Sequence, residues 1–255
     1  MPIDYPFLLG ICSLFIAKSC LPEFLQYGKT YRPKENSKYS SVLERIKKFT
    51  VSKAYFSHFY YLATFLSLVT LYYYPKFPIV WIIFGHSLRR LYETLYVLHY
   101  TSNSRMNWSH YLVGIWFYSV LLLILNISLY KNSIPNTLNM NAFIIFCIAS
   151  WDQYKNHVIL ANLVKYSLPT GRLFRLVCCP HYLDEIIIYS TLLPYEQEFY
   201  LTLVWVITSL TISALETKNY YRHKFKDNHV APYRHNTFYN LVMCTLGHSY
   251  TYIYI

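Results

Sequence analysis

The feature that most constrains this chain is a mainly apolar run over residues 111–130, which contains no charged side chain. A helix needs about 20 such residues to cross the hydrocarbon core of a bilayer. Only 14% of all residues are charged, whereas soluble domains carry about 25%, so there is too little charge to cover a water-facing surface. The other mainly apolar stretches are residues 7–17, 55–74, 77–100, 142–163, 185–193 and 199–215. The sequence therefore predicts an all-α fold, a multi-spanning membrane helix bundle of about six to seven transmembrane helices.

Basic residues are concentrated between the apolar runs. The formal net charge is +11, and residues 29–53 form a basic loop, which the positive-inside rule places on the cytosolic side. Membrane lipids are the expected partners of such loops. Nucleic acid is not expected as a partner, because the basic residues do not lie on a soluble module. No long hydrophilic linker divides the chain, so we expect one integral membrane domain over residues 1–255.

Cysteine and glycine spacing argues against several common sites. The six cysteines include no C-x-x-C pair, so neither a disulfide framework nor a metal site is expected. The six glycines form neither a G-x-G-x-x-G motif nor a P-loop. A soluble dinucleotide-binding module is therefore not expected either.

Three charged residues lie within the apolar stretch 77–100, where a charge at bilayer depth costs about 2.5–3.5 kcal/mol. Glu93 is three residues from Arg90 and four from Arg89, so the three share one helical face. Two interpretations remain open for them. The glutamate forms an internal salt bridge with the arginines, or the arginines form an anion site for a phosphate or carboxylate.

Three further polar clusters lie at residues 152–165, 171–185 and 216–226. In the first cluster Gln153 and His157 are four residues apart and share a helical face. A loop, a capped helix start and a cytosolic anchor can explain the three clusters when each is taken alone. None of them defines a site by itself.

Taken together, four segments resemble the polyprenol reductase branch of the steroid 5α-reductase family. They read FSHFY at 56–60, HSLRRLYE at 86–93, HVILANL at 157–163 and PHYLDE at 180–185. Their order and spacing are also similar, and the resemblance covers residues 56–225. Four motifs in order are much more specific than any one of them alone.

The resemblance implies NADPH-dependent reduction of the α-isoprene double bond of a polyprenoid, on the route to dolichol that supports protein N-glycosylation. It implies a seven-helix protein of the endoplasmic reticulum membrane, with NADPH inside the bundle near the cytosolic face and a long-chain polyprenoid lipid as substrate. By residue matching, the implied cofactor-binding residues are Arg90, His157, Asn162, His181, Glu185 and Tyr221.

Reaction chemistry favours polyprenal over polyprenol as the immediate substrate. Hydride addition to an isolated allylic alcohol leaves the developing charge without support. An unsaturated aldehyde places that charge on oxygen, where a hydrogen-bond donor stabilises it. Tyr92, Glu93 and His58 are the candidates for this catalytic, oxygen-polarising role.

The chain departs from the family pattern towards its end. Thr217 and Lys218 stand near the place where the family often has a histidine, just before the position of Tyr221, and residues 234–255 form a divergent tail. Two functions from other classes also stay open. One is a membrane methyltransferase of related architecture that would bind S-adenosylmethionine, and the other is a non-enzymatic membrane adaptor.

Overall fold

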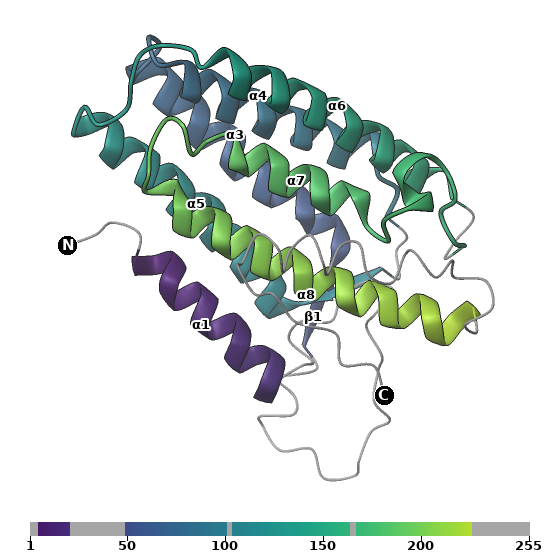
Figure 1. Ribbon diagram of the computed structural model, residues 1–255. Helices are drawn as coiled ribbons and strands as arrows, with labels where there is room; N and C mark the ends of the chain where they lie inside the picture. Colours follow the sequence, from purple (N-terminus) through teal and green to yellow (C-terminus); the bar gives the residue numbers. More distant parts are fainter. Residues whose placement is uncertain (1–4, 21–48, 101–103, 164–166, 226–255) are drawn as a thin grey trace, which may run out of the picture.

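Helices make up most of the computed structural model, which describes residues 5–20, 49–100, 104–163 and 167–225. They lie roughly side by side in one bundle (Figure 1), and the prediction of a mainly helical chain is confirmed. The α-helices are α1 (Tyr5–Cys20), α3 (Phe56–Tyr73), α4 (Pro78–Tyr92), α5 (Trp108–Tyr130), α6 (Met140–Ala161), α7 (Pro180–Ser190) and α8 (Phe199–Phe225). The short helical turns are η3 (Lys53–Tyr55), the π-helical η4 (Glu93–Val97) and η5 (Arg172–Arg175).

Local sequence signals set where several helices begin. Pro78 stands at the first turn of α4, where its missing N–H costs no helical hydrogen bond. Asn107 caps α5 by accepting a hydrogen bond from the Ser109 backbone N–H at 3.0 Å. Asn139 caps α6 in the same way, through the Ala142 N–H at 3.1 Å. These signals mark the starts of α4, α5 and α6.

Two described helices, α5 and α8, are long and apolar enough to cross a membrane, and α1 is a shorter apolar helix. At 23 residues, α5 is about 34 Å long, which matches the hydrocarbon core. Large apolar side chains also face outward, among them Leu9 at 71%, Phe65 at 63% and Ile148 at 65% exposure. An exposed apolar surface of this kind is typical of a protein that contacts lipid.

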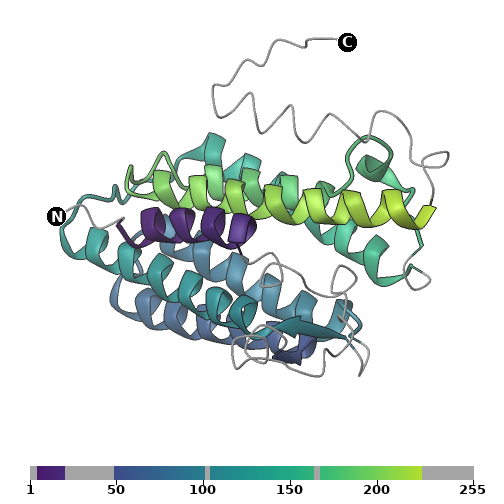
Figure 2. The ribbon, with the colours of Figure 1, turned by 90° about the horizontal axis from the view of Figure 1, so that it is seen from below.

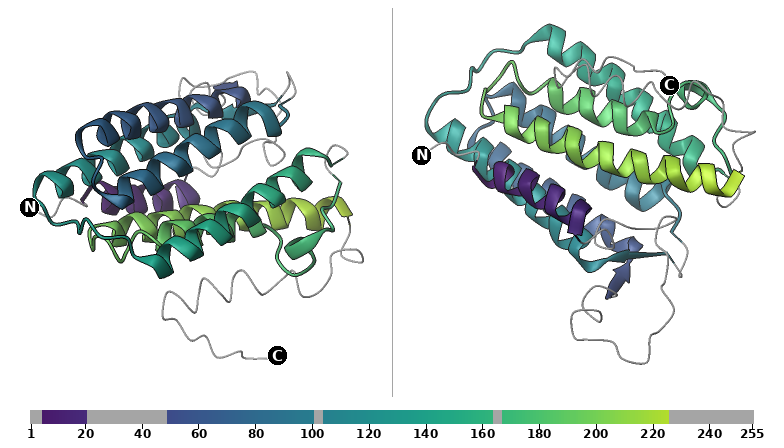
Figure 3. Two further views of the ribbon diagram at one scale, coloured as in Figure 1. Left: turned by 90° about the horizontal axis from the view of Figure 1, so that it is seen from above. Right: turned by 60° about the horizontal axis from the view of Figure 1, so that its bottom comes forward.

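The helices form two sides of the bundle, and polar side chains lie between these two sides. Helix α3 packs against both α4 and α5, whereas α7 packs against both α6 and α8. In the left panel of Figure 3, α3 and α4 (blue) lie on the side of the bundle opposite to α7 and α8 (green). The site described below joins these two sides.

An aromatic cluster fixes α1 to the rest of the bundle. Helix α1 lies beside α8, as Figure 2 shows. The Phe7 ring is fully buried and meets the rings of Trp116 and Phe117 on α5 at centroid distances of 5.5 and 5.8 Å. Trp205 on α8 stacks on Phe117 at 4.8 Å. The short first apolar run therefore forms a helix that packs into the core.

One departure from the all-α prediction is a two-stranded antiparallel sheet of β1 (Thr50–Ser52) and β2 (Arg105–Asn107). In it Thr50 pairs with Asn107, and the Arg105 guanidinium donates to the Thr50 carbonyl oxygen at 3.0 Å. Both segments read as polar connections in the sequence. The two segments meet because α3 and α5, which follow them in the chain, pack side by side. Pairing then satisfies backbone N–H and C=O groups that form no helical hydrogen bond.

Some predictions fall outside the described residues. They include most of the basic loop, up to residue 48, and the divergent tail at 234–255. The predicted span at 185–193 falls largely within α7, which has 11 residues and is too short to cross a bilayer alone.

We expect Gly114→Ala to destabilise the bundle and Gly85→Ala to leave it intact. A Cβ atom at Gly114 would lie 2.6 Å from the Phe59 ring, so α3 and α5 would be pushed apart at a cost of about 1–3 kcal/mol. A Cβ atom at Gly85 meets no atom within 4 Å, and alanine is the better helix former there. Thermal unfolding midpoints of the two variants in detergent measure the difference, and equal midpoints would contradict the close packing of α3 on α5.

Candidate functional site

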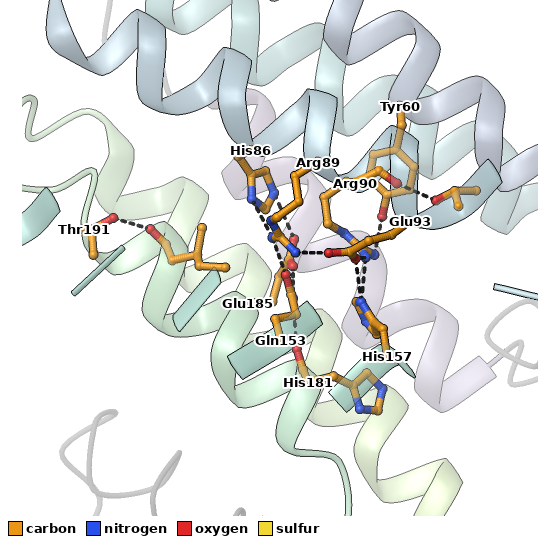
Figure 4. A network of polar contacts seen from close by, with 12 residues as sticks. Tyr60, His86, Arg89, Arg90, Glu93, Gln153, His157, His181, Glu185 and Thr191 are labelled. Carbon is orange, nitrogen blue, oxygen red and sulfur yellow. Dashed lines mark hydrogen bonds and ion pairs between the residues drawn. The ribbon is translucent and has the colours of Figure 1, made fainter. Parts of the chain in front are cut away.

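A buried carboxylate at the end of α4 is bound by three cationic or donor side chains (Figure 4). Glu93 is fully buried. Its Oε2 accepts a hydrogen bond from Arg90 Nη1 at 2.5 Å, and its Oε1 accepts one from Arg89. The π-helical turn η4 begins at this residue, and such turns often mark functional sites in helices. The internal salt bridge that the spacing suggested is therefore present, and it involves both arginines.

Helix α6 adds two polar side chains to this network, one at the carboxylate and one at Arg89. His157 Nδ1 lies 2.6 Å from Glu93 Oε2 and 3.0 Å from Arg90 Nη1, so it donates to the carboxylate in one tautomer and accepts from the guanidinium in the other. Gln153 accepts from Arg89 Nη2 at 2.6 Å through its Oε1. Through its Nε2 the same amide donates to the His181 carbonyl oxygen at 3.1 Å and to Glu185. Gln153 therefore connects the arginines of α4 with the start of α7.

The charges of this network balance. Arg89 and Arg90 supply two positive charges, and Glu93 and Glu185 supply two negative ones. His86 Nε2 lies 3.5 Å from Glu185 Oε1. Buried charges are tolerated only when they are paired and hydrogen-bonded. The network therefore holds α4, α6 and α7 in one arrangement.

Tyr60 on α3 completes the surroundings of Arg90. Its hydroxyl accepts from Arg90 Nη2 at 2.7 Å, and the guanidinium carbon lies 4.9 Å from the centroid of its ring. Arg90 is 9% exposed and Tyr60 7%. The arginine is thus fixed by a carboxylate on one side and by an aromatic face on the other, which is the environment that a guanidinium favours.

Arg90 also lines a cavity of about 500 Å³, the size range of ligand pockets in proteins. Side chains from α3, α4, α6, α7 and α8 form its wall. The polar residues in the wall include Lys53, Tyr60, Arg90, His157, His181 and Tyr221. Leu160, Phe174 and Tyr182 add apolar surface. A cavity with this lining can hold an elongated ligand that has both anionic groups and flat rings.

Six of the nine predicted site residues come together. Arg90, His157, His181 and Tyr221 line the cavity. Glu93 and Glu185 do not line it but belong to the network behind its wall.

The other three predicted residues lie apart from the cavity wall. The Tyr92 side chain is 52% exposed, and its ring contacts Tyr96 at 5.3 Å. His58 is also exposed, and its Nδ1 lies 3.1 Å from the Tyr111 hydroxyl. Asn162 is exposed at the end of α6. The catalytic role of Tyr92 and His58 and the cofactor role of Asn162 stay predictions that this arrangement does not support directly.

Sequence reasoning missed three members of the network as site residues, Tyr60, His86 and Gln153. Each carried a weak signal. Tyr60 and His86 lie in the segments that resemble the reductase family, and Gln153 shares a helical face with His157. Only the packing of four helices brings them to the same point. Among the described residues no group of three or more His, Cys, Asp or Glu side chains lies together as metal ligands would.

Comparison with known proteins gives one consistent result. A family model described as 3-oxo-5-alpha-steroid 4-dehydrogenase matches residues 109–235. The polyprenal reductase of Saccharomyces cerevisiae is 98% identical over 227 residues, which cover 89% of this chain and 90% of that protein. The polyprenal reductase of Caenorhabditis elegans is 28% identical over 292 aligned residues, covering 86% of this chain and 91% of that protein. Polyprenal reductase 1 of Oryza sativa subsp. indica is 27% identical over 308 aligned residues, covering 83% of this chain and 86% of that protein.

We expect Glu93→Gln to destabilise the protein by about 3–5 kcal/mol, because it leaves the buried Arg90 and the half-buried Arg89 short of one negative charge. Glu198→Gln is the matched control. Glu198 pairs with Lys131 at 3.9 Å near the surface, where such a pair contributes about 0–1 kcal/mol. Unfolding midpoints in detergent compare the two variants. Equal losses would mean that the buried network does not stabilise the fold.

Proposed function

Since the chain belongs to the 3-oxo-5-alpha-steroid 4-dehydrogenase family and to its polyprenal reductase branch, we propose that it reduces the α-isoprene double bond of a polyprenoid with NADPH. The product lies on the route to dolichol, which supports protein N-glycosylation. The observation that carries this proposal is the 98% identity to the yeast polyprenal reductase. The large cavity bounded by Arg90 and the buried network supports it independently.

The residues around the cavity fit NADPH by their chemistry. Arg90 and Lys53 provide positive charge for phosphate groups, and the forked donors of arginine suit phosphate oxygens. The rings of Phe174, Tyr182 and Tyr221 provide flat surfaces against which a base or a nicotinamide can pack. The volume of about 500 Å³ is large enough for most of such a ligand. When bound, NADPH supplies the hydride.

Contacts within the protein fix the position of Arg90 in the cavity wall. Glu93 and Tyr60 fix Arg90 before any ligand arrives, so little side-chain entropy is lost on binding. The Glu93 carboxylate is already engaged by Arg89, Arg90 and His157. We therefore assign Glu93 a positioning role in place of the oxygen-polarising role that the sequence suggested.

The immediate substrate in this proposal is polyprenal. The aldehyde conjugates the double bond with an oxygen, and this oxygen can take up the charge that develops when hydride adds to the β carbon. An alcohol offers no such acceptor. The relatives in yeast, worm and rice are named as polyprenal reductases, which is consistent with this choice.

The proposal includes a location and an architecture. We place residues 1–255 in one membrane domain of the endoplasmic reticulum, with about six to seven transmembrane helices. The membrane-length helices α5 and α8 and the exposed apolar side chains of the bundle support a membrane protein. A long polyprenoid would reach the site from the same lipid phase.

Purified protein should oxidise NADPH when supplied with polyprenal and not when supplied with polyprenol. We expect Arg90→Ala to weaken NADPH binding by about 30-fold or more, because removal of one partner of a buried charge pair costs about 2–5 kcal/mol. Arg90→Lys keeps the charge but loses the fork, so its loss should be intermediate. Arg175→Ala, at an exposed arginine, is the control. NADPH binding is followed by ligand-dependent thermal stabilisation, and turnover by formation of the saturated aldehyde.

The same experiment separates the two rival functions. Stabilisation by S-adenosylmethionine instead of NADPH would support the methyltransferase. Absence of turnover with both substrates, together with no effect of Arg90→Ala on any ligand, would support the adaptor.

A further inference from the structure

One face of α8 presents polar side chains to the large cavity. Ser213, Glu216 and Thr217 line the cavity, and Tyr221 lines it one turn further along the helix. Residues three or four positions apart share a face of a helix, so these side chains follow one another along the cavity wall. We call Ser213, Glu216 and Thr217 the α8 polar face.

The side chains of the α8 polar face make no hydrogen bond or ion pair within the part of the chain that the structure describes. Thr208 and Thr211, which stand earlier on the same helix, each donate to a backbone carbonyl oxygen one turn back, at 2.8 and 2.6 Å. Thr217 is 7% exposed, and the other two side chains are half-buried. Polar groups taken out of water need a hydrogen-bonding partner. The α8 polar face therefore points to a ligand in the cavity.

Glu216 also gives the cavity wall two sides of opposite charge. It is the only acidic side chain among the described residues that line the cavity, whereas Lys53 and Arg90 are cationic. Lys53 stands just before α3 and Arg90 lies on α4, and the left panel of Figure 3 shows α3 and α4 on the side of the bundle opposite to α8. A guanidinium binds phosphate groups, whereas a carboxylate repels them. Phosphates are therefore expected at α3 and α4 and not at α8.

The chemistry of the α8 polar face defines the group that fits it. A carboxylate only accepts hydrogen bonds, whereas the hydroxyls of serine and threonine both donate and accept. The matching group therefore has N–H or O–H donors for Glu216, an oxygen acceptor for a hydroxyl, and no negative charge. An aldehyde or an isoprene unit has no such donor. In a nicotinamide dinucleotide, the carboxamide and the ribose hydroxyls meet all three conditions.

We propose that Glu216, together with Ser213 and Thr217, binds an uncharged hydrogen-bonding group of NADPH, which is its carboxamide or a pair of ribose hydroxyls. This inference rests on the proposed function and adds to it the residues of α8 that recognise the cofactor. A dinucleotide carries both phosphates and uncharged donors, so it satisfies both sides of the cavity at once. The opposite charges of the two sides then determine the direction in which the cofactor lies.

The sign of a substitution effect distinguishes contact from mere proximity. NADPH is an anion, so a carboxylate that lies near it without a hydrogen bond weakens its binding by repulsion. Removal of such a carboxylate would tighten NADPH binding. A carboxylate that accepts a hydrogen bond from the ligand has the opposite effect, because its removal leaves the donor of the ligand without a partner.

The test is the dissociation constant of NADPH, measured by calorimetry on the full-length protein in detergent without a lipid substrate. Glu216→Ala should weaken binding by about 10- to 100-fold, the range for loss of a hydrogen bond to a charged group. Glu216→Gln keeps an acceptor and should lie between Glu216→Ala and native protein. Thr217→Val, which keeps the shape of the side chain, should weaken binding by a smaller factor. Unfolding midpoints without ligand show that each variant is folded.

Glu198→Ala is the matched control. Glu198 stands just before α8 and pairs with Lys131 at 3.9 Å, and it does not line the cavity. Its removal should leave the dissociation constant of NADPH unchanged. An equal loss in Glu198→Ala and Glu216→Ala would mean that α8 acts through its packing, which would overturn the contact with Glu216.

The 3-acetylpyridine analogue of NADPH distinguishes the two kinds of ligand group, because a methyl group replaces its amide nitrogen. If Glu216 binds the carboxamide, native protein should bind the analogue about 10-fold or more weakly than NADPH, and Glu216→Ala should bind both equally. If it binds ribose hydroxyls, Glu216→Ala should weaken both ligands by the same factor. Binding of NADPH by Glu216→Ala as tightly as by native protein, or more tightly, would overturn the inference and leave the reductase intact. If native protein does not bind NADPH, the proposed function fails and this inference fails with it.

Discussion

The buried Glu93 carboxylate is the constraint on which the rest of the structure depends. It holds two arginines and a histidine from two sides of the bundle at hydrogen-bond distance. A charge at this depth is costly unless it is compensated. The helices that supply the compensation, α4 and α6, are therefore tied to each other by electrostatics where their apolar faces do not pack closely.

This network also separates two cavities of different polarity in the interior of the bundle. On one side it presents Arg90 to a cavity large enough for a cofactor, and on the other His86 faces a small apolar cavity. Arg89 and Gln153 link the two ends through hydrogen bonds. The balanced ion network therefore lies between a polar cavity and an apolar one within a single bundle.

Several polar residues of the network lie at helix ends and turns. Glu93 begins the π-helical turn that follows α4, and His181 and Glu185 lie in the first turns of α7. Helix interiors such as that of α5 are left for apolar packing. The apolar faces of the helices suit contact with lipid, whereas the polar side chains at the helix ends form the buried network.

The sequence alone determined the helical class, the positions of the main helices, the Arg89–Arg90–Glu93 cluster and, through four motifs, the family. These follow from local periodicity, spacing and residue type, which act over a few turns of helix. The tertiary structure alone decided that Tyr60 holds Arg90, that Gln153 bridges α4 and α7, and that Tyr92 and His58 lie away from the cavity. It also decided that two polar segments pair as strands. Contacts between residues 30 to 67 positions apart, such as Tyr60 with Arg90 and Arg90 with His157, depend on how whole helices pack, and no local pattern encodes that.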